Sequence, residues 1–190
     1  MLRRRLAAPA AALAAATAAA LLATAGPASA DVPGSGFIYR ITTSSALAVD
    51  VSGASQDWGA PVIDWYVNGH SNQSWELVSV GNTPNEFQIV NENSGLCLAI
   101  NAASTGLYDG ASIIQFKCLG NAPTEQWIFQ PHYLGNGSGN ENYYTIASAA
   151  DTGYVLDVPA DNTVPGTALE IWGANGGLSQ QFYIVELDIA

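Results

Sequence analysis

Short stretches of alternating apolar and polar residues, separated by Gly, Asn and Ser, follow one another from about residue 37 to residue 188. An alternation with a period of two places the apolar side chains on one face of a β-strand. No stretch of any length has the period of an amphipathic helix. The pattern therefore predicts an all-β domain of many short strands, which is typical of a sandwich or a barrel.

One arrangement of residues occurs three times in this part of the chain. Each copy opens with an aromatic-x-Ile, continues about a dozen residues later with an alternating apolar strand, and closes with a polar-x-aromatic triplet. The apolar strands cover residues 47–51, 96–100 and 154–158. The aromatic residues that close the triplets stand 52 and then 55 positions apart, at Trp75, Trp127 and Phe182.

Three units of about fifty residues predict a barrel with pseudo-threefold symmetry. One unit is too small to bury its own apolar face, so the three must share one core. The repeats span about 37–80, 85–131 and 142–188, and the Gly- and Asn-rich stretch 135–142 is the longest expected surface loop. In each apolar strand the fourth residue should face outward, away from the core. These outward residues are Asp50, Ala99 and Asp157.

The first thirty residues differ from the rest and have the features of a cleaved signal peptide. Three arginines at 3–5 form a basic head, an Ala- and Leu-rich run covers 6–25, and a small-x-small pattern follows at 28–30. A retained membrane anchor is the alternative, which the weakly apolar, Ala-dominated run disfavours. The sequence therefore predicts a secreted, extracellular protein whose mature domain spans residues 31–190.

Removal of this segment would leave a strongly acidic domain. Only Arg40 and Lys117 remain against 16 acidic residues, a net charge of −14 with His neutral. Binding to nucleic acid or to an anionic membrane requires cations that replace the counterions of phosphate groups. We therefore expect neither partner, whereas the acidic surface favours solubility and leaves neutral ligands open.

Two cysteines, Cys97 and Cys118, stand in a chain that we expect to reach an oxidising compartment. A disulfide that closes the loop between them would stabilise the fold by about 3 kcal/mol. A zinc site is the alternative, but only His70 and His132 are available and no pair of ligands has a short spacing. No metal or other cofactor is therefore expected, and both histidines are interpreted as turn residues without a role.

These motifs resemble those of the ricin B-type lectins, a family of β-trefoil proteins that bind carbohydrate. The resemblance rests on the Gln-x-Trp that closes a repeat, on the Leu-x-Val-Asp-Val strand at 47–51 and on the aromatic residue eight positions before the Gln. It covers essentially the whole mature chain. It implies a β-trefoil fold, a sugar ligand and a disulfide within repeat two, because Cys97 and Cys118 stand where the family places its pair.

Sugar recognition requires few residue types, and repeat one has the fullest set. A carboxylate accepts charge-assisted hydrogen bonds from neighbouring hydroxyls, an aromatic ring covers the apolar C–H face of a pyranose, and an amide both donates and accepts. By the resemblance, Asp50 is the acceptor, Trp65 is the platform and Asn72 is the amide partner. Gln73 orients the site, and Trp75 belongs to the core.

Repeat three has an altered set of these residues, and repeat two lacks the acid. The candidates of repeat three are Asp157, Glu170, Trp172, Ser179 and Gln180. Glu170 stands where repeat one has Ile63, and Ser179 replaces the Asn. Repeat two has Ala99 in place of the acid and Glu125 in place of the Gln. We therefore expect no binding of the family kind in repeat two, and a structural role for that repeat.

Ordinary structural roles compete with these assignments. Asp50 and Asp157 are residues that turns and strand ends also favour. Their shared phase with Trp65 and Trp172 makes a site the better interpretation. The closing aromatic residues are better explained as core than as ligand contacts. Trp58 stands outside the repeat pattern and receives no role, although a surface contact is one option.

The chain is predicted to bind and not to catalyse. Hydrolysis of a glycoside needs two carboxylates placed across one bond, and with 16 acidic residues some pair meets that distance by chance. No Ser/His/Asp order, nucleophile elbow or cluster of metal ligands is found in the sequence. We expect a secreted, monomeric lectin or carbohydrate-binding module, whose target by resemblance is a galactose-containing or plant-type polysaccharide. The alternatives are a protease inhibitor or interaction module with 132–142 as its contact loop, and a trefoil without a ligand.

Overall fold

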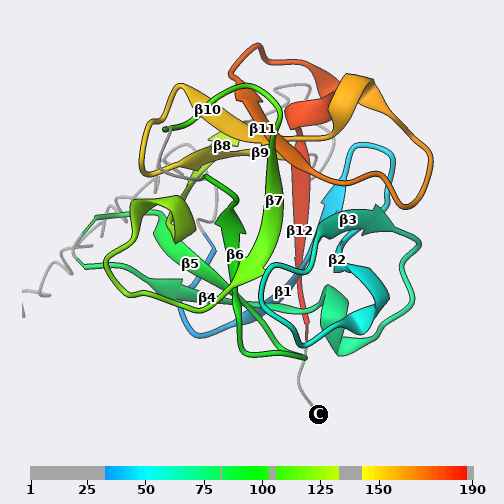
Figure 1. Cartoon of the computed structure of the whole chain (residues 1–190), viewed down its shortest axis with the longest axis horizontal. Coiled ribbons are helices and arrows are strands. Elements are labelled where there is room, and N and C mark those ends of the chain that lie inside the picture. Colours follow the sequence, from blue (N-terminus) through cyan, green and yellow to red (C-terminus); the bar gives the residue numbers. More distant parts are fainter. Residues whose placement is uncertain (1–32, 82, 103–105, 133–142, 188–190) are drawn as a thin grey trace, which may run out of the picture.

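The structure is a computed structural model that describes residues 33–81, 83–102, 106–132 and 143–187 (Figure 1). The predicted signal peptide at 1–30 and the predicted loop at 135–142 lie outside the described residues, so both stay predictions. In the part that is described, no helix has the length and apolar character needed to cross a membrane.

The described part of the chain contains twelve β-strands, four from each repeat, which confirms the all-β prediction. The strands of repeat one are β1 (Ile38–Thr43), β2 (Ala48–Val51), β3 (Val62–Trp65) and β4 (Trp75–Ser79). Those of repeat two are β5 (Glu86–Asn91), β6 (Cys97–Ile100), β7 (Ala111–Phe116) and β8 (Trp127–His132). Those of repeat three are β9 (Tyr143–Ser148), β10 (Tyr154–Asp157), β11 (Glu170–Gly173) and β12 (Phe182–Glu186).

Short 3-10 helices connect these strands at equivalent places. One precedes the last strand of each repeat, namely η2 (Ser71–Gln73), η3 (Pro123–Glu125) and η5 (Leu178–Gln180). Two more follow the second strand in repeats one and three, namely η1 (Ser52–Ala54) and η4 (Pro159–Asp161). The described part of repeat two has no such turn after β6.

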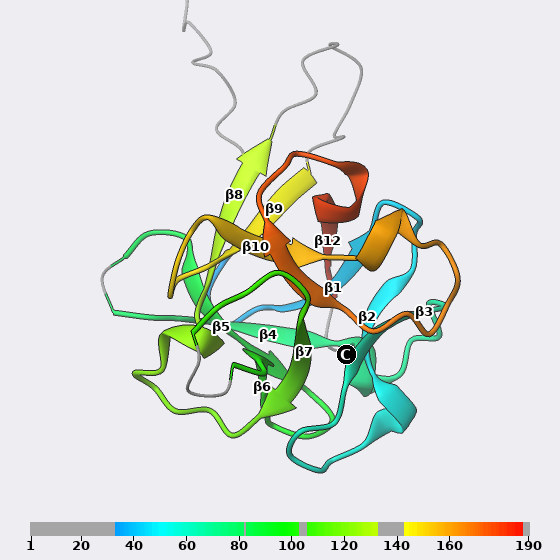
Figure 2. The ribbon, with the colours of Figure 1, turned by 45° about the horizontal axis from the view of Figure 1, so that its top comes forward.

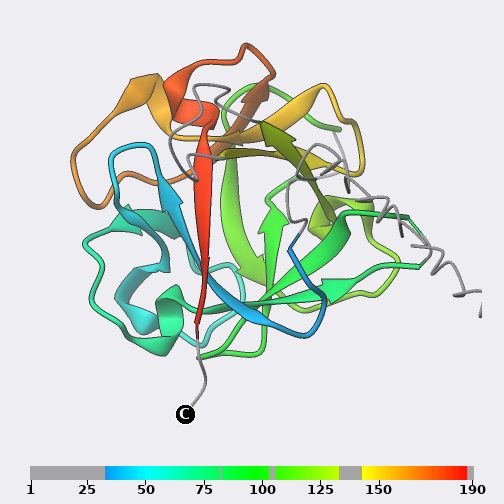
Figure 3. The same ribbon diagram turned by 180° about the vertical axis from the view of Figure 1, so that it is seen from behind.

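The first and last strands of the three repeats close a six-stranded antiparallel barrel. β1 pairs with β4 and β12, β5 pairs with β4 and β8, and β9 pairs with β8 and β12. Figure 3 shows the red β12 beside the blue β1, so that the end of the domain joins its beginning. Closure of the ring pairs the edges that a row of strands would otherwise expose.

The second and third strands of each repeat form a hairpin, and the three hairpins have the same register. Ala48 faces Trp65, Cys97 faces Phe116, and Val155 faces Trp172 across their ladders. The hairpins meet one another through the pairing of β7 with β11 and through two single bridges. One joins Pro61, just before β3, to repeat two, and the other joins Ile63 of β3 to repeat three. Figure 2 shows the third strand of each repeat, namely the labelled β3 and β7 and the orange β11. Six barrel strands with three symmetric hairpins are a β-trefoil, as predicted.

The closing triplets place their aromatic rings in the shared core. Trp75, Trp127 and Phe182 are fully buried, as predicted. Trp75 Nε1 donates to Val49 O at 3.0 Å, and Trp127 Nε1 donates to Leu98 O at 2.9 Å. A buried indole needs a partner for its N–H. Each of these two bonds therefore ties the end of a repeat to the residue just before its outward position.

Candidate functional site

The hairpin register brings the acid and the platform of repeat one to the same side of the sheet. Asp50 lies directly opposite Ile63 on β3, and Trp65 is two residues further along that strand. Side chains two positions apart share a face, and such diagonal neighbours lie about 7 Å apart. The structure therefore brings Asp50 and Trp65 together, as the sequence predicts.

A cavity of about 320 Å³ opens between these two side chains. Asp50, Ile63, Trp65 and Asn72 line it, together with the three residues of η1 and with Asn68 and His70. Trp65 is 40% exposed, so part of its indole is open to solvent. The cavity is therefore lined by an apolar indole ring and, beside it, by polar side chains.

The acid itself is less open than the sequence suggests. The outward direction of Asp50 and Asp157 is correct, but their exposed fractions are only 3% and 4%. The reason is that η2 and η5, from the end of the same repeat, pack against the second strand and cover the acid.

Gln73 lies behind the acid and holds it. Its Nε2 donates to Asp50 Oδ2 at 2.7 Å and to Tyr66 O at 2.8 Å, and its Oε1 accepts from Asn68 N at 2.9 Å. Gln73 is 1% exposed, and both ends of its amide are used by the protein. Gln73 therefore fixes the rotamer of Asp50, and its amide has little capacity left for a ligand.

Asn72, which lines the same cavity, leaves one buried polar atom unused. Its Nδ2 donates to Val51 O at 3.1 Å, which fixes the orientation of the amide. Its Oδ1 is buried and has no hydrogen-bond partner among the described residues. A buried carbonyl oxygen without a partner costs stability, and such atoms in native structures call for an explanation. A hydroxyl donor that reached this oxygen when a ligand binds would satisfy it.

Burial raises the pKa of Asp50, because removal from water disfavours the charged carboxylate. Hydrogen bonds from Gln73 and Asn72 and the nearby His70 act in the opposite direction and lower the pKa. His70 also lines the cavity and thus belongs to the site, which the interpretation of this residue as a turn residue without a role misses. The sequence contains no signal for this, because His70 reaches the cavity from the irregular segment that precedes η2.

Repeat three forms a second cavity, of about 430 Å³, with the same design. The predicted residues Asp157, Glu170, Trp172 and Ser179 line it, together with Asn175 and the residues of η4. Ser179 Oγ donates to Asp157 Oδ2 at 3.0 Å. Gln180 accepts from Asn175 N at 2.8 Å and donates to Gly173 O at 3.1 Å, so it repeats the loop contacts of Gln73. Trp172 is 41% exposed.

The second cavity is more acidic than the first. Asp157 lies directly opposite Glu170 in the ladder, where repeat one has Ile63. Burial raises the pKa of Glu170, and the charges of Asp157 and Asp109 raise it further. Burial likewise raises the pKa of Asp157, Gln180 and Ser179 lower it, and Asp161 raises it. The two cavities therefore present different charges to a ligand.

Each platform ring rests on a glycine from another repeat. Gly166 has φ of +97°, and a Cβ there would come within 3.2 Å of the Trp65 indole. Gly110 has φ of +86°, and a Cβ there would lie 4.0 Å from Trp172 and 3.5 Å from Glu170 Oε2. The positive φ favours glycine at both positions, and at Gly166 the close approach of the Trp65 ring does so as well. The sites therefore depend on the trefoil as a whole.

Repeat two keeps the platform position but loses the acid. Ala99 is buried at the acid position, and Phe116 holds the platform position. Glu125 Oε2 accepts from Leu119 N at 2.6 Å, which replaces the contact that Gln73 makes with Asn68. A carboxylate cannot donate to a second acid, so Glu125 is compatible with Ala99 and not with an aspartate there. The cavity that repeat two forms beside Ala99 and Phe116 measures about 200 Å³.

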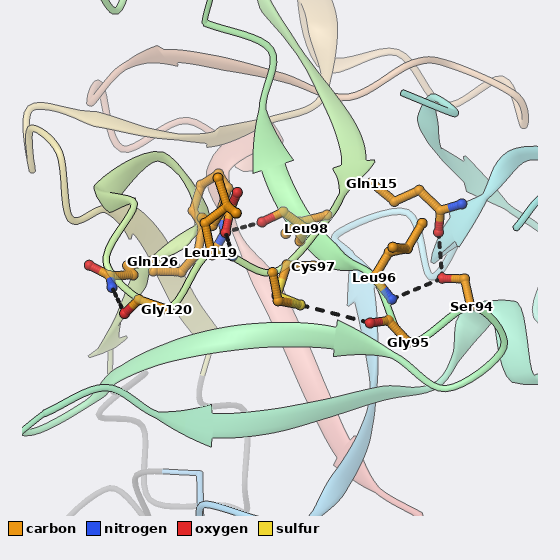
Figure 4. The surroundings of a disulfide bond; sticks show 12 residues. Ser94, Gly95, Leu96, Cys97, Leu98, Gln115, Leu119, Gly120 and Gln126 are labelled. Atoms are coloured by element: carbon orange, nitrogen blue, oxygen red, sulfur yellow. Dashed lines mark hydrogen bonds between the residues drawn. A yellow bond between two sulfur atoms is a disulfide. The ribbon is translucent and has the colours of Figure 1, made fainter. Parts of the chain in front are cut away.

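A disulfide joins Cys97 at the start of β6 to Cys118 just beyond β7, with a Cα–Cα distance of 5.1 Å (Figure 4). The pairing confirms the prediction, and no free cysteine remains in the described residues. In the same region no group of three or more His, Cys, Asp or Glu residues is placed to hold a metal ion.

Comparison with known proteins decides the family. The model of the family described as ricin-type beta-trefoil lectin domain-like matches residues 31–116 and 123–189. The chain belongs to this family. Comparison with curated protein sequences found no match.

Solved structures of this ricin-type lectin family and of related proteins share the fold. The designed threefold-symmetric protein ThreeFoil is 32% identical, with a TM-score of 0.66 over 79% of this chain and 99% of that one. An exo-β-1,3-galactanase from Clostridium thermocellum, 1,3Gal43A, is 28% identical, with a TM-score of 0.68 over 82% of this chain and only 31% of the enzyme. The Macrolepiota procera ricin B-like lectin, solved with lactose, is 23% identical, with a TM-score of 0.61 over 80% and 96% of the two chains.

The disulfide of repeat two predicts a measurable contribution to stability. Replacing both Cys97 and Cys118 by Ser should lower the free energy of unfolding by about 3 kcal/mol, because the unfolded chain gains the freedom of the open loop. Urea denaturation followed by fluorescence measures the change. An unchanged free energy of unfolding in the double variant would contradict the interpretation.

The raised pKa values predict how stability depends on pH. Burial raises the pKa of the carboxyl groups of Asp50, Asp64, Glu92, Glu125, Asp157 and Glu170. Because these folded-state values lie above the unfolded ones, the folded chain takes up protons first as the pH falls, and the free energy of unfolding should rise from about pH 7 to about pH 4.5. Denaturation at several pH values measures the slope. Asp50→Asn and Asp157→Asn should flatten it, and stability that falls over this range would contradict the assignment.

Proposed function

We propose that this member of the ricin-type lectin family binds galactose-containing sugars through the cavities of repeats one and three. The observation that carries the proposal is the composition of cavity one. The exposed indole of Trp65, the carboxylate of Asp50 locked by Gln73, and Asn72, whose buried Oδ1 has no partner among the described residues, line the same space of about 320 Å³. A pyranose offers what each of these needs, namely an apolar face for Trp65 and hydroxyl donors for Asp50 and Asn72.

The preference for galactose is supported by the similar proteins. The enzyme that is 28% identical is an exo-β-1,3-galactanase, and a lectin with the same fold was solved with lactose. The trefoil matches about a third of that galactanase. We therefore propose a galactose-containing polysaccharide, including plant-type polymers, as the target, and a secreted monomer as the acting form.

The geometry of the acids supports binding rather than hydrolysis. In glycosidases two carboxyl groups flank the scissile bond from different sides. Asp157 and Glu170 instead leave the same face of one hairpin, where they lie directly opposite each other in the ladder. Asp157 is also held by Ser179 Oγ at 3.0 Å. The pair would therefore approach a sugar from one side, and we propose no catalytic step.

The alternative of a protease inhibitor or interaction module gains no support from the described residues. Its predicted contact loop is 132–142, of which only His132 is described. His132 lies at the end of β8, where it stacks on Tyr143 with ring centroids 4.6 Å apart and interacts with Thr145 Oγ1 at 3.0 Å. The interpretation of His132 as a turn residue is therefore wrong, and its ring is engaged within the fold.

Substitution of the two acids tests the proposed sites. The mature protein should bind lactose with a stoichiometry of two and a Kd of about 1 mM at each site, which is typical of a single shallow sugar site. Asp50→Ala and Asp157→Ala should each reduce the stoichiometry to one, and the double variant should lose lactose binding at both cavities. On a β-1,3-galactan surface each single variant should bind about a hundredfold more weakly, because avidity is lost.

Isothermal titration calorimetry and a glycan array measure these changes. Glu186→Ala is the matched control, because it removes an exposed carboxylate from β12 that lines neither cavity. Undiminished lactose binding in the folded double variant would remove the site assignment. Inhibition of a protease panel without any signal on the glycan array would favour the inhibitor alternative.

The pH dependence of binding should be opposite to that of stability. Only the ionised carboxylate makes charge-assisted bonds with sugar hydroxyls, and burial raises the pKa of both Asp50 and Asp157 above the ordinary 3.8. Affinity for lactose should therefore decrease as the pH falls toward 3.8, while the free energy of unfolding increases. Lactose titrations between about pH 7 and about pH 4 measure the change in affinity. Affinity that stays constant over that range would contradict the role of the acids.

A further inference from the structure

Repeat two retains an aromatic ring in the platform position although its acid is missing. Phe116 faces Cys97 across the β6–β7 ladder, as Trp65 faces Ala48 and Trp172 faces Val155. Phe116 is 36% exposed, close to the exposure of the two platform indoles. The ring is therefore presented to solvent at the third symmetric position, without a carboxylate beside it.

A second ring from another repeat lies against Phe116. Trp58 stands in the loop between η1 and β3 of repeat one, and its ring centroid is 6.0 Å from that of Phe116 at an interplanar angle of 56°. Trp58 is 63% exposed. The two rings form one aromatic surface across the boundary of repeats one and two, which is called the Trp58–Phe116 surface below. Neither cavity one nor cavity three includes Trp58.

A buried amide fixes the loop that carries Trp58. Gln115 is fully buried, and its Nε2 donates to Ser55 O and to Asp57 O at 2.9 Å each. Its Oε1 accepts from Ser94 Oγ at 2.7 Å, a bond visible in Figure 4. The backbone adds a bond from Gly59 N to Gln115 O at 2.8 Å. The loop is therefore held on both sides of Trp58.

This brace distinguishes the Trp58 loop from its counterparts. The residue before the platform is Gln115 in repeat two, but Asp64 in repeat one and Ile171 in repeat three. Asp64 Oδ1 accepts one bond, from Thr167 N, and Ile171 has no polar side-chain atom. A fixed loop loses little conformational freedom when a ligand binds, so an exposed ring on it is well suited to recognition.

We propose that the Trp58–Phe116 surface is a third sugar-binding surface, which takes the apolar face of a pyranose unit within a polysaccharide and needs no carboxylate. The loop that carries Trp58 also carries an amide. Gln56, two residues before Trp58, is exposed, and its Nε2 donates to Asn93 O at 3.2 Å. Amides offer donors and acceptors to sugar hydroxyls. The inference rests on the proposed function, because it extends the same polysaccharide from the two cavities to the third repeat.

The five tryptophans of the chain allow one titration to test each surface separately. Trp58, Trp65 and Trp172 are exposed at the three surfaces, whereas Trp75 and Trp127 are buried and serve as internal references. The indole N–H signals of 15N-labelled protein are followed by NMR during addition of oligosaccharides of β-1,3-galactan, xylan and cellulose. Single Trp→Phe variants assign the signals.

In the Asp50→Ala/Asp157→Ala variant, at least one of these oligosaccharides should shift the Trp58 signal. No shift of Trp58 with any of them would overturn the third surface. In the native protein, shifts of Trp65 and Trp172 test the two cavities independently. Failure of the proposed function and failure of this inference therefore give different spectra.

Substitution provides a second test with a matched control. Trp58→Ala should weaken binding to the polysaccharide that shifts Trp58 by about tenfold, because one of the linked contacts is lost. It should leave lactose affinity at the two cavities unchanged, because Trp58 lines neither of them. Trp58→Phe should restore most of the loss by keeping a ring. Phe37→Ala removes another exposed ring, 50% exposed and outside all three surfaces, and should have no effect. Equal binding of Trp58→Ala and the native protein would contradict the inference.

Discussion

The sites depend on the hydrogen bonds that each closing triplet makes to the second strand of its own repeat. In repeat one the triplet holds two successive residues of β2, because Trp75 Nε1 donates to Val49 O at 3.0 Å and Gln73 Nε2 donates to Asp50 Oδ2 at 2.7 Å. Burial of the indole is driven by the core, and it brings the amide to the acid without further cost of ordering. Core formation and preparation of the site are therefore one event.

These hydrogen bonds differ among the repeats, and the differences match the residues at the acid position and in the closing triplet. Repeat two keeps the indole bond to Leu98 O, but Glu125 replaces the donor and Ala99 replaces the acid. Repeat three has Phe182 without an indole N–H, and there Ser179 Oγ bonds to Asp157. The acid and its donor are present together or absent together. A buried carboxylate without a donor would be costly, so the loss of both is consistent.

Strand alternation and a repeat that occurs three times predicted the all-β barrel, whereas the resemblance to the ricin B-type lectins implied the trefoil, the disulfide and the placement of acid beside ring. The sequence did not predict that Asp50 is only 3% exposed, since the cover comes from η2, about twenty residues further along. Ala54 and Ala160, in the η1 and η4 turns that line the cavities, have φ of 50° and 55°. Alanine carries no sequence signal for that conformation. The contact of Trp58 with Phe116 joins two repeats, which local patterns do not report.

The central claim is that a locked acid, a free amide oxygen and an exposed ring converge on one sugar. A crystal structure of the mature protein grown with lactose tests this most directly. The account predicts the galactose unit with hydroxyls within hydrogen-bond distance of the Asp50 carboxylate and Asn72 Oδ1, and with its apolar face on Trp65. Lactose bound elsewhere on the trefoil, with cavities one and three both empty, would contradict it.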